Sequence, residues 1–190
     1  MSLADIITLP NKHLRQKSQK IHIIDDEVKK IIDKMQESTL DWEASREHEV
    51  GVALAAVQID KLIKLVVIRN DFDDKSDTSF KVFINPEITK LEGEIVEDFE
   101  GCLSIKDIYG RVPRHSKVRI KATNTEGQEI KIKAEGFLAR VFQHEIDHTN
   151  GIVFVDHIKE TKDAFYLLTT DGKLEKLDYD QEISKNSILW

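Results

Sequence analysis

The sequence predicts an α+β fold, in which mixed but mainly antiparallel strands surround a central helix that carries a His-Glu-x-x-His motif. Three patterns support this prediction. Apolar residues recur at helical spacing through residues 137–149. Apolar and charged residues alternate in residues 117–122 and 129–134, as they do in a half-buried β-hairpin. A second amphipathic helix, over residues 26–40, is expected to pack outside the sheet.

The first half of the chain is expected to form this outer helix followed by strands. Asp25 provides an acidic cap for the helix over residues 26–40. A polar, acidic loop is expected over residues 41–49. Asn85 and Pro86 are expected to separate two strands. The strands expected in this half cover residues 62–69, 80–84 and 88–99, with an acidic loop at 70–79.

Two β-hairpins are expected in the second half, the first from residues 117–122 and 129–134 and the second from residues 164–169 and 174–179. The first has aliphatic residues at its inward positions and basic residues at its outward positions. The outward residues are Lys117, Arg119, Lys121, Lys131 and Lys133. Such a face suits an anionic partner such as ribosomal RNA. A solvated sheet face is the favoured interpretation.

Length and composition indicate an ordinary globular protein. With 190 residues, a single domain over residues 1–190 is expected. Apolar residues make up 40% of the chain and charged residues 33%. The net charge of −7 argues against DNA as a partner. No apolar run is long enough for a membrane span and the start lacks a signal-peptide pattern, so a cytoplasmic monomer without a membrane partner is expected.

The strongest chemical signal is the stretch Gln-His-Glu-Ile-Asp-His at residues 143–148. On a helix, His144 and His148 lie one turn apart and can hold one metal ion from one side. Glu145 can then reach a metal-bound water without being a ligand, which is the pattern of a metal hydrolase. A chance match with surface-paired side chains is the alternative. The apolar stripes of this helix favour the metal site, because they place the motif on a buried face.

A catalytic site with two histidines needs a third ligand and one open position. The chain has one cysteine, Cys102, so it has no intrachain disulfide. A lone cysteine is usually a small buried apolar residue. The more specific hypothesis is that Cys102 is a thiolate ligand to the metal. Gly101 beside it has no side chain, so the backbone can approach closely there. The remaining histidines lack ligand spacing and are expected at the surface; they are His13, His22, His48, His115 and His157.

Three blocks along the chain together resemble the peptide deformylase family. Residues 51–58 are Gly-Val-Ala-Leu-Ala-Ala-Val-Gln, residues 100–104 are Glu-Gly-Cys-Leu-Ser, and residues 143–148 are Gln-His-Glu-Ile-Asp-His. The second and third blocks match the family pattern and are together highly specific. The likeness extends over about residues 3–158 and includes the Val-Pro-Arg stretch at 112–114.

The resemblance implies removal of the formyl group from the N-formylmethionine of newly made polypeptides. Cys102, His144 and His148 would bind one Fe²⁺ per chain, with Zn²⁺, Ni²⁺ or Co²⁺ as replacements. Glu145 would act as general base on the bound water and then protonate the leaving amine.

The same resemblance implies further roles in binding. The Gln58 side chain and the Leu103 backbone N–H would stabilise the oxyanion. Backbone near the first block would pair with the substrate like an added strand. The substrate-binding residues implied are Gly51, Val52, Ala53, Leu54 and Gly101.

The chain departs from the family pattern at several positions. Ala53 stands where the family has its second glycine, and its methyl group would narrow the substrate slot. Val57 and Lys106 each replace a common proline. The loop over residues 41–49 is longer than usual and is expected to overhang the cleft. Some members of the family end in a C-terminal helix that docks on the ribosome. A hairpin is expected here instead, over residues 164–179, so the sequence does not predict the same mode of docking.

Two other functions are weighed against deformylation. The first is a metallopeptidase of His-Glu-x-x-His type; Gln58 and the cysteine block argue against it, because common peptidase sites use His or Glu as third ligand. The second is a catalytically weak relative that serves as a peptide- or ribosome-binding module. The intact Glu145 argues against that role, because a binding module needs no general base.

Overall fold

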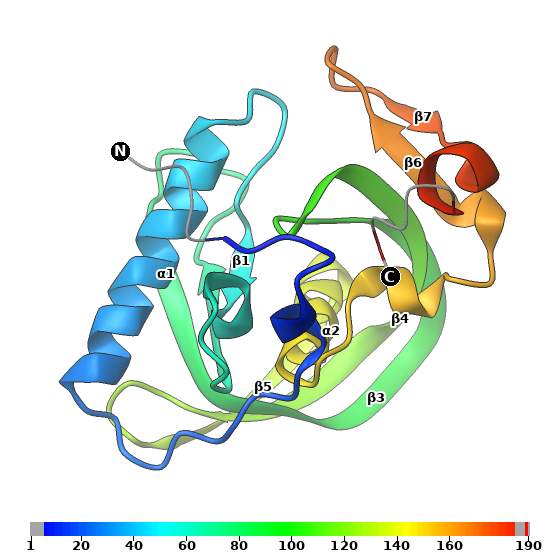
Figure 1. Cartoon of the computed structure of the whole chain (residues 1–190). Coiled ribbons are helices and arrows are strands. Elements are labelled where there is room, and N and C mark those ends of the chain that lie inside the picture. The colour runs from blue at the N-terminus through cyan, green and yellow to red at the C-terminus, as the bar shows by residue number, and fades with distance from the viewer. Residues whose placement is uncertain (1–5, 185–188, 190) are drawn as a thin grey trace.

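In the computed structural model, which describes residues 6–184 and 189, a curved sheet wraps around one central helix, α2 (Figure 1). The helices are α1 (Asp26–Ala44) and α2 (Gly136–Thr149). The strands are β1 (Ala53–Ala55), β2 (Leu65–Arg69), β3 (Phe80–Cys102), β4 (Ile105–Thr123), β5 (Glu129–Glu135), β6 (Phe165–Leu168) and β7 (Leu174–Lys176). Single helical turns lie at Lys12–Arg15, Ala56–Ile59, Phe154–His157, Lys162–Ala164 and Tyr179–Ser184.

The seven strands form one sheet in the order β1-β2-β3-β4-β6-β7, and β5 also pairs with β4. All of these pairings are antiparallel. One isolated parallel bridge joins Gln19 and Ile63. The α+β class, the mainly antiparallel sheet and the central motif helix are therefore confirmed.

The two longest strands, β3 and β4, form a single hairpin that is far longer than the sequence suggested. Its turn consists of Leu103 and Ser104, so Cys102 is the last residue of β3. The expected break at Asn85 and Pro86 is wrong, because β3 continues through both. The register shifts between Ile84 and Glu87, and Asn85 adopts a φ of 51°. A β-bulge absorbs the proline without ending the strand.

Helix α1 begins as predicted and ends later than predicted. The Asp25 side chain accepts a hydrogen bond from the Val28 N–H at 3.0 Å, which confirms the cap. The helix continues to Ala44, so the first part of the expected 41–49 loop is helical. Glu43 in this last turn is held by ion pairing with the buried Arg69 at 2.5 Å. This tertiary contact stabilises a turn whose polar residues suggested a loop.

The two helices cover opposite faces of the first strands. Alternate residues of β1 and β2 face α2 and α1, because side chains alternate along a strand. The α2 side includes Ala53, Val66 and Ile68. The α1 side includes Leu54 and Val67. As predicted, α1 packs on the outer face of the sheet and α2 lies inside its curve.

The β4–β5 hairpin has the predicted inward and outward sides. Val118 and Ile120 are each 1% exposed. Its basic residues make ion pairs across the surface: Lys117 with Glu135 at 3.0 Å, Arg119 with Glu92 at 2.6 Å, and Lys121 with Glu129 at 2.7 Å. Because acidic neighbours offset these charges, the solvated-face interpretation is favoured over an RNA-binding surface.

The second predicted hairpin is present as β6 and β7, with strands shorter than the expected 164–169 and 174–179. Strand β2 likewise begins three residues later than expected, at Leu65. Among the described residues, neither α1 nor α2 is both long and apolar enough to cross a membrane.

Phe142 is expected to be a main support of the core between α2 and the sheet. It is 1% exposed, and its ring meets the Phe83 ring edge-on at 5.0 Å between centroids. We expect Phe142→Ala to lower the free energy of unfolding by about 3–5 kcal/mol through lost burial and a cavity. Urea denaturation of metal-stripped protein would measure it. Ile23→Ala, at a side chain 74% exposed, is the control; equal stability of the two variants would contradict the assigned packing.

Candidate active site

Helix α2 holds three motif residues inside the protein. The His144 side chain is 11% exposed, Glu145 is 5% exposed and His148 is fully buried. The apolar residues around them pack on the concave side of the sheet, which turns this face of the helix inward.

The C-terminal end of α2 is fixed by a glycine. Gly151 has a φ of 77°, in the region where glycine is favoured. A Cβ at this position would lie only 2.6 Å from the backbone oxygen of Arg15. Helix α2 therefore ends at Thr149, where the helical spacing of apolar residues also ends, and the N-terminal segment packs directly against this end.

Cys102 meets the two histidines where the last residue of β3 passes α2. Ligand atoms of Cys102, His144 and His148 all lie within 4.8 Å of one another. The Cys102 Sγ is 3.3 Å from the His148 Nε2. Metal ions bind thiolate and imidazole ligands at about 2.0–2.3 Å, so donors this close can share one ion. The predicted three-residue metal site is thus assembled from two distant segments.

The two histidines are prepared for a metal in different ways. Burial alone would lower the pKa of His144, but hydrogen bonds with Cys102 and Glu100 hold it well above its usual range, so a metal bound there displaces a proton. The His144 Nδ1 lies 3.0 Å from the Glu100 carboxylate, which leaves its Nε2 for a metal. Burial, followed by the positive charges of His144 and Arg114, holds the pKa of His148 well below its usual range. The neutral imidazole is the form that binds metal. A thiolate with two imidazoles therefore fits a divalent ion of the iron or zinc type.

Glu145 lies beside this ligand set and is not part of it. Its Oε2 is buried and has no hydrogen-bond partner among the described residues. Burial raises the pKa of Glu145 to about 7. A carboxylate of this kind is suited to exchange protons with a water molecule near neutral pH.

A pocket of about 290 Å³ opens over these residues. Its lining includes Gln58, Cys102, Leu103, His144 and Glu145. The Gln58 Oε1 accepts the Ala55 N–H at 2.9 Å, and this bond orients the amide. Its Nε2 then lies 3.5 Å from the Cys102 Sγ and 3.1 Å from the Ser104 Oγ. An N–H donor is therefore held at the metal site.

The remaining candidate substrate-binding residues fall into two groups. Val52, Ala53 and Gly101 line the pocket. Gly51 and Leu54 lie outside the lining. The Gly51 N–H donates to Glu43 at 2.8 Å, and Leu54 is fully buried on the α1 side of β1.

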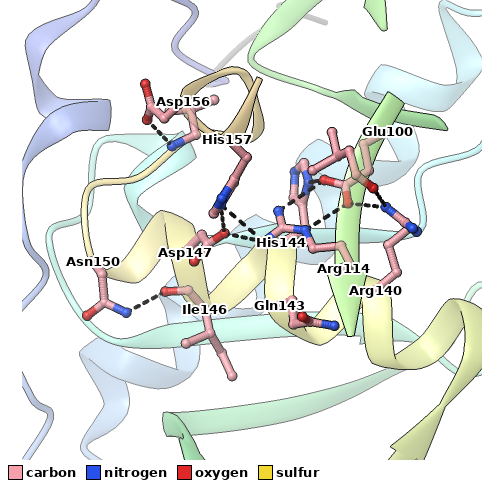
Figure 2. A network of polar contacts seen from close by, with 12 residues as sticks. Glu100, Arg114, Arg140, Gln143, His144, Ile146, Asp147, Asn150, Asp156 and His157 are labelled. Atoms are coloured by element: carbon pink, nitrogen blue, oxygen red, sulfur yellow. Dashed lines mark hydrogen bonds and ion pairs between the residues drawn. The ribbon is translucent and has the colours of Figure 1, made fainter. Parts of the chain in front are cut away.

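A buried charge network behind the site was not assigned from the sequence (Figure 2). Glu100 pairs with Arg114 at 2.9 Å and with Arg140 at 2.7 Å, in addition to its contact with His144. Burial favours the neutral form of Glu100, but hydrogen bonds with His144 and Arg114 outweigh it and hold the pKa of Glu100 well below its usual range. Arg114 continues to Asp147 at 2.5 Å. The sequence does contain a signal for two of these residues, because Glu100 and Arg114 each lie in a stretch that resembles the family pattern.

The loop after α1 forms one wall of the pocket, as expected for the overhanging segment. His48 and Glu49 of the loop are among the lining residues, as is Trp42 in the last turn of α1. The Glu49 carboxylate accepts a hydrogen bond from the Tyr109 hydroxyl at 2.8 Å. His48 was expected only at the surface; it is exposed and also faces the pocket.

None of the other four histidines joins the metal-ligand group found among the described residues. His13 and His22 are partly or largely exposed. His157 contacts Asp147 at 2.7 Å from the exposed end of the charge network. His115 is half-buried, and its Nδ1 has no partner within the described part of the chain.

Comparisons with known proteins agree with this site. A family model described as polypeptide deformylase matches residues 3–164. The peptide deformylase of Rhodopseudomonas palustris (strain TIE-1) is 40% identical over 170 residues, which cover 88% of this chain and 92% of the relative. The one from Brachyspira hyodysenteriae is 42% identical over 159 residues, covering 83% and 81%.

Solved structures give the same result. A peptide deformylase from Synechococcus elongatus in complex with actinonin superposes with a TM-score of 0.73 at 34% identity, covering 80% of this chain and 78% of that chain. A peptide deformylase from Legionella pneumophila superposes with a TM-score of 0.70 at 38% identity, covering 80% and 83%.

Glu100→Gln is expected to weaken metal binding while keeping the side-chain shape. The change removes the negative charge that orients His144, and loss of such a partner typically costs about 10–100-fold in metal affinity. Competition with a coloured chelator for Zn²⁺ or Co²⁺ would measure it. The control is Glu97→Gln on the same strand, where the side chain is 61% exposed. Equal affinity of both variants, at matched circular dichroism, would refute the role of Glu100.

Proposed function

This chain belongs to the peptide deformylase family, and we propose that its pocket removes the formyl group from N-formylmethionine at the start of newly made polypeptides. One observation carries the proposal: the buried Glu145 carboxylate lies beside the Cys102–His144–His148 ligand set in the same pocket as the Gln58 amide. Hydrolysis of a formamide needs an activated water, a polarised carbonyl and a proton for the leaving nitrogen. This group of residues is equipped for all three.

We assign the metal ligands as Cys102, His144 and His148, and the ion as Fe²⁺, one per chain. A divalent ion bound there supplies Lewis-acid activation of water and of the formyl oxygen. The soft thiolate and the two imidazoles suit iron or zinc, and Ni²⁺ or Co²⁺ can replace them. The choice of iron comes from the family resemblance. Metal analysis of protein purified without oxygen would test it.

Glu145 is the proposed general base and acid. Its carboxylate takes a proton from the attacking water and delivers that proton to the nitrogen that leaves as the peptide's amino group. Its burial supports this role, because a pKa of about 7 allows both proton uptake and proton release near neutral pH.

Gln58 and Leu103 are the proposed donors to the oxyanion. The Gln58 Nε2 is held toward the metal site by the bond between its Oε1 and the Ala55 N–H. Leu103 lines the pocket from the β3–β4 turn, next to Cys102. Each well-placed donor contributes about 3–4 kcal/mol to the stability of the transition state in enzymes that use such sites.

The substrate backbone is proposed to pair with the segment that contains β1. Strand β1 is the end strand of the sheet, bonded to β2 on one side. An extended peptide can add to an exposed strand edge. Val52 and Ala53 line the pocket from this segment, and Gly101 lines it from β3. Gly51 and Leu54, which lie outside the lining, are the other residues assigned to the segment.

We further propose that residues 1–190 act as one catalytic domain and as a monomer in the cytoplasm, where its substrate is made. Binding to the ribosome is compatible with this role, but no residue is assigned to it. A second function, as a peptide-binding module without catalysis, is disfavoured because a binder would not need a buried general base beside three metal ligands.

Formate release tests the proposal directly. Formyl-Met-Ala-Ser should yield formate and Met-Ala-Ser, whereas the unformylated peptide should stay intact. Cleavage of the unformylated peptide would instead identify a metallopeptidase. Binding of either peptide without turnover, in metal-loaded protein, would identify a binding module.

Glu145→Gln is expected to retain the metal and lose about 10²–10⁴-fold in kcat, because an amide cannot take the proton of the water. Metal content and formate release should be measured on the same samples. Glu135→Gln, at the exposed start of α2, should keep full activity. A Glu145 variant that is as active as the wild type at equal metal content would exclude the general-base role.

Ala53 tests the proposed substrate strand. It is not among the described non-glycine residues with positive φ, so the backbone does not require the family's glycine. We expect Ala53→Gly to stay within about tenfold of wild-type kcat/KM, and Ala53→Val to raise KM more than it lowers kcat. Ala122→Val, in the same core cluster outside the pocket lining, controls for overpacking. An unchanged KM in Ala53→Val would show that this segment does not line the peptide.

A further inference from the structure

The β6–β7 hairpin lies beyond the part of the chain that the family model matches, which ends at residue 164. It nevertheless lies beside the end of β4 (Figure 1), where β6 pairs with Tyr109, a residue of the pocket lining. Two of its residues contact side chains that line the pocket. The hairpin is therefore placed to act on the substrate.

The first contact is between aromatic rings. Tyr166 on β6 meets Phe99 on β3 edge-on, with 4.9 Å between ring centroids and an interplanar angle of 88°. Phe99 lines the pocket and is 38% exposed. Tyr166 lies opposite Tyr109, another lining residue, so its side chain is on the pocket side of the sheet.

The second contact is at the hairpin turn. Gly172 has a φ of 78°, and a Cβ there would lie 2.9 Å from the Cγ of His48. His48 belongs to the loop after α1 and lines the pocket. The same loop is tied to β4, the strand that pairs with β6, by Arg46, which bonds Asp107 at 2.6 Å. The hairpin thus joins two walls of the pocket.

The position of Phe99 indicates which part of a substrate would reach this wall. A strand advances about 3.3 Å per residue, so Phe99 lies about 10 Å along β3 from Cys102. An extended peptide whose formyl group is at Cys102 covers that distance by its third residue. The Phe99 ring, which is partly exposed and uncharged, favours contact with an apolar side chain.

We propose that Phe99 and Tyr166 form a subsite for an apolar side chain at the third residue of the formylated peptide, which makes the β6–β7 hairpin a specificity-determining wall of the cleft. The inference rests on the proposed deformylase function and names a substrate preference of the same site. Tyr166, which packs against Phe99 beside the pocket lining, contributes by holding the Phe99 ring.

Two peptides and four variants test the subsite. Formyl-Met-Ala-Phe and formyl-Met-Ala-Ser are compared by kcat/KM for formate release. The wild type should prefer the phenylalanine peptide by about three- to tenfold, the usual effect of one aromatic contact. Tyr166→Ala and Phe99→Ala should each bring the ratio close to one, mainly through KM, whereas Tyr166→Phe should keep it.

Glu175→Ala is the matched control on the same hairpin. Glu175 is exposed and pairs with Leu167, so it lies on the face opposite Tyr166. This variant should keep both the ratio and the activity of the wild type. Melting temperatures identify any variant whose hairpin has unfolded, and binding of the product Met-Ala-Phe by calorimetry gives a readout independent of turnover.

The possible results separate this inference from the proposed function. Two results overturn the subsite and leave the function intact. In the first, the wild type releases formate equally well from both peptides. In the second, Tyr166→Ala and Phe99→Ala are folded and still prefer the phenylalanine peptide. No formate from either peptide overturns the function, and the subsite with it.

Discussion

The burial of one carboxylate, that of Glu100, is the constraint on which the site depends. A charge in the interior is costly unless it is paired and hydrogen-bonded. Glu100 meets this requirement with Arg114 from β4, Arg140 from α2 and His144 from α2. These partners come from β4 and α2, so pairing the buried charge keeps the end of β3 and helix α2 in one arrangement. That arrangement places Cys102 at the two histidines.

A second buried ion pair plays a similar part on the opposite side of the pocket. Arg69 at the end of β2 is fully buried and pairs with Glu43 in the last turn of α1. The Glu43 carboxylate also accepts the Gly51 N–H, just before β1. The helix, the central sheet and the proposed substrate strand are therefore joined through one side chain. Both walls of the pocket rest on buried charges rather than on apolar packing alone.

The parts of the fold and site that follow from the local geometry of helices and strands could be predicted from the sequence. Helical spacing determines that His144 and His148 share a face, because the backbone repeat sets it within one turn. Strand alternation similarly determines which side of the β4–β5 hairpin is buried. Predictions were wrong where tertiary contacts override the local conformational preference of the chain. The bulge at Asn85, whose side chain bonds the backbone of Ile21 at 2.7–2.8 Å, carries β3 through Pro86.

By itself, the sequence determined the chemistry available to this protein: a helical histidine pair with an adjoining carboxylate, one cysteine, and three blocks that resemble a known family. Only the tertiary structure decided how these parts meet. Cys102 and His144 lie in different elements, and no local pattern states their distance. The contacts of Glu100, and those of Tyr166 and Gly172 at the pocket, also join segments far apart in the chain. Such long-range contacts depend on how the whole sheet curves around α2, because its curvature sums over many residues.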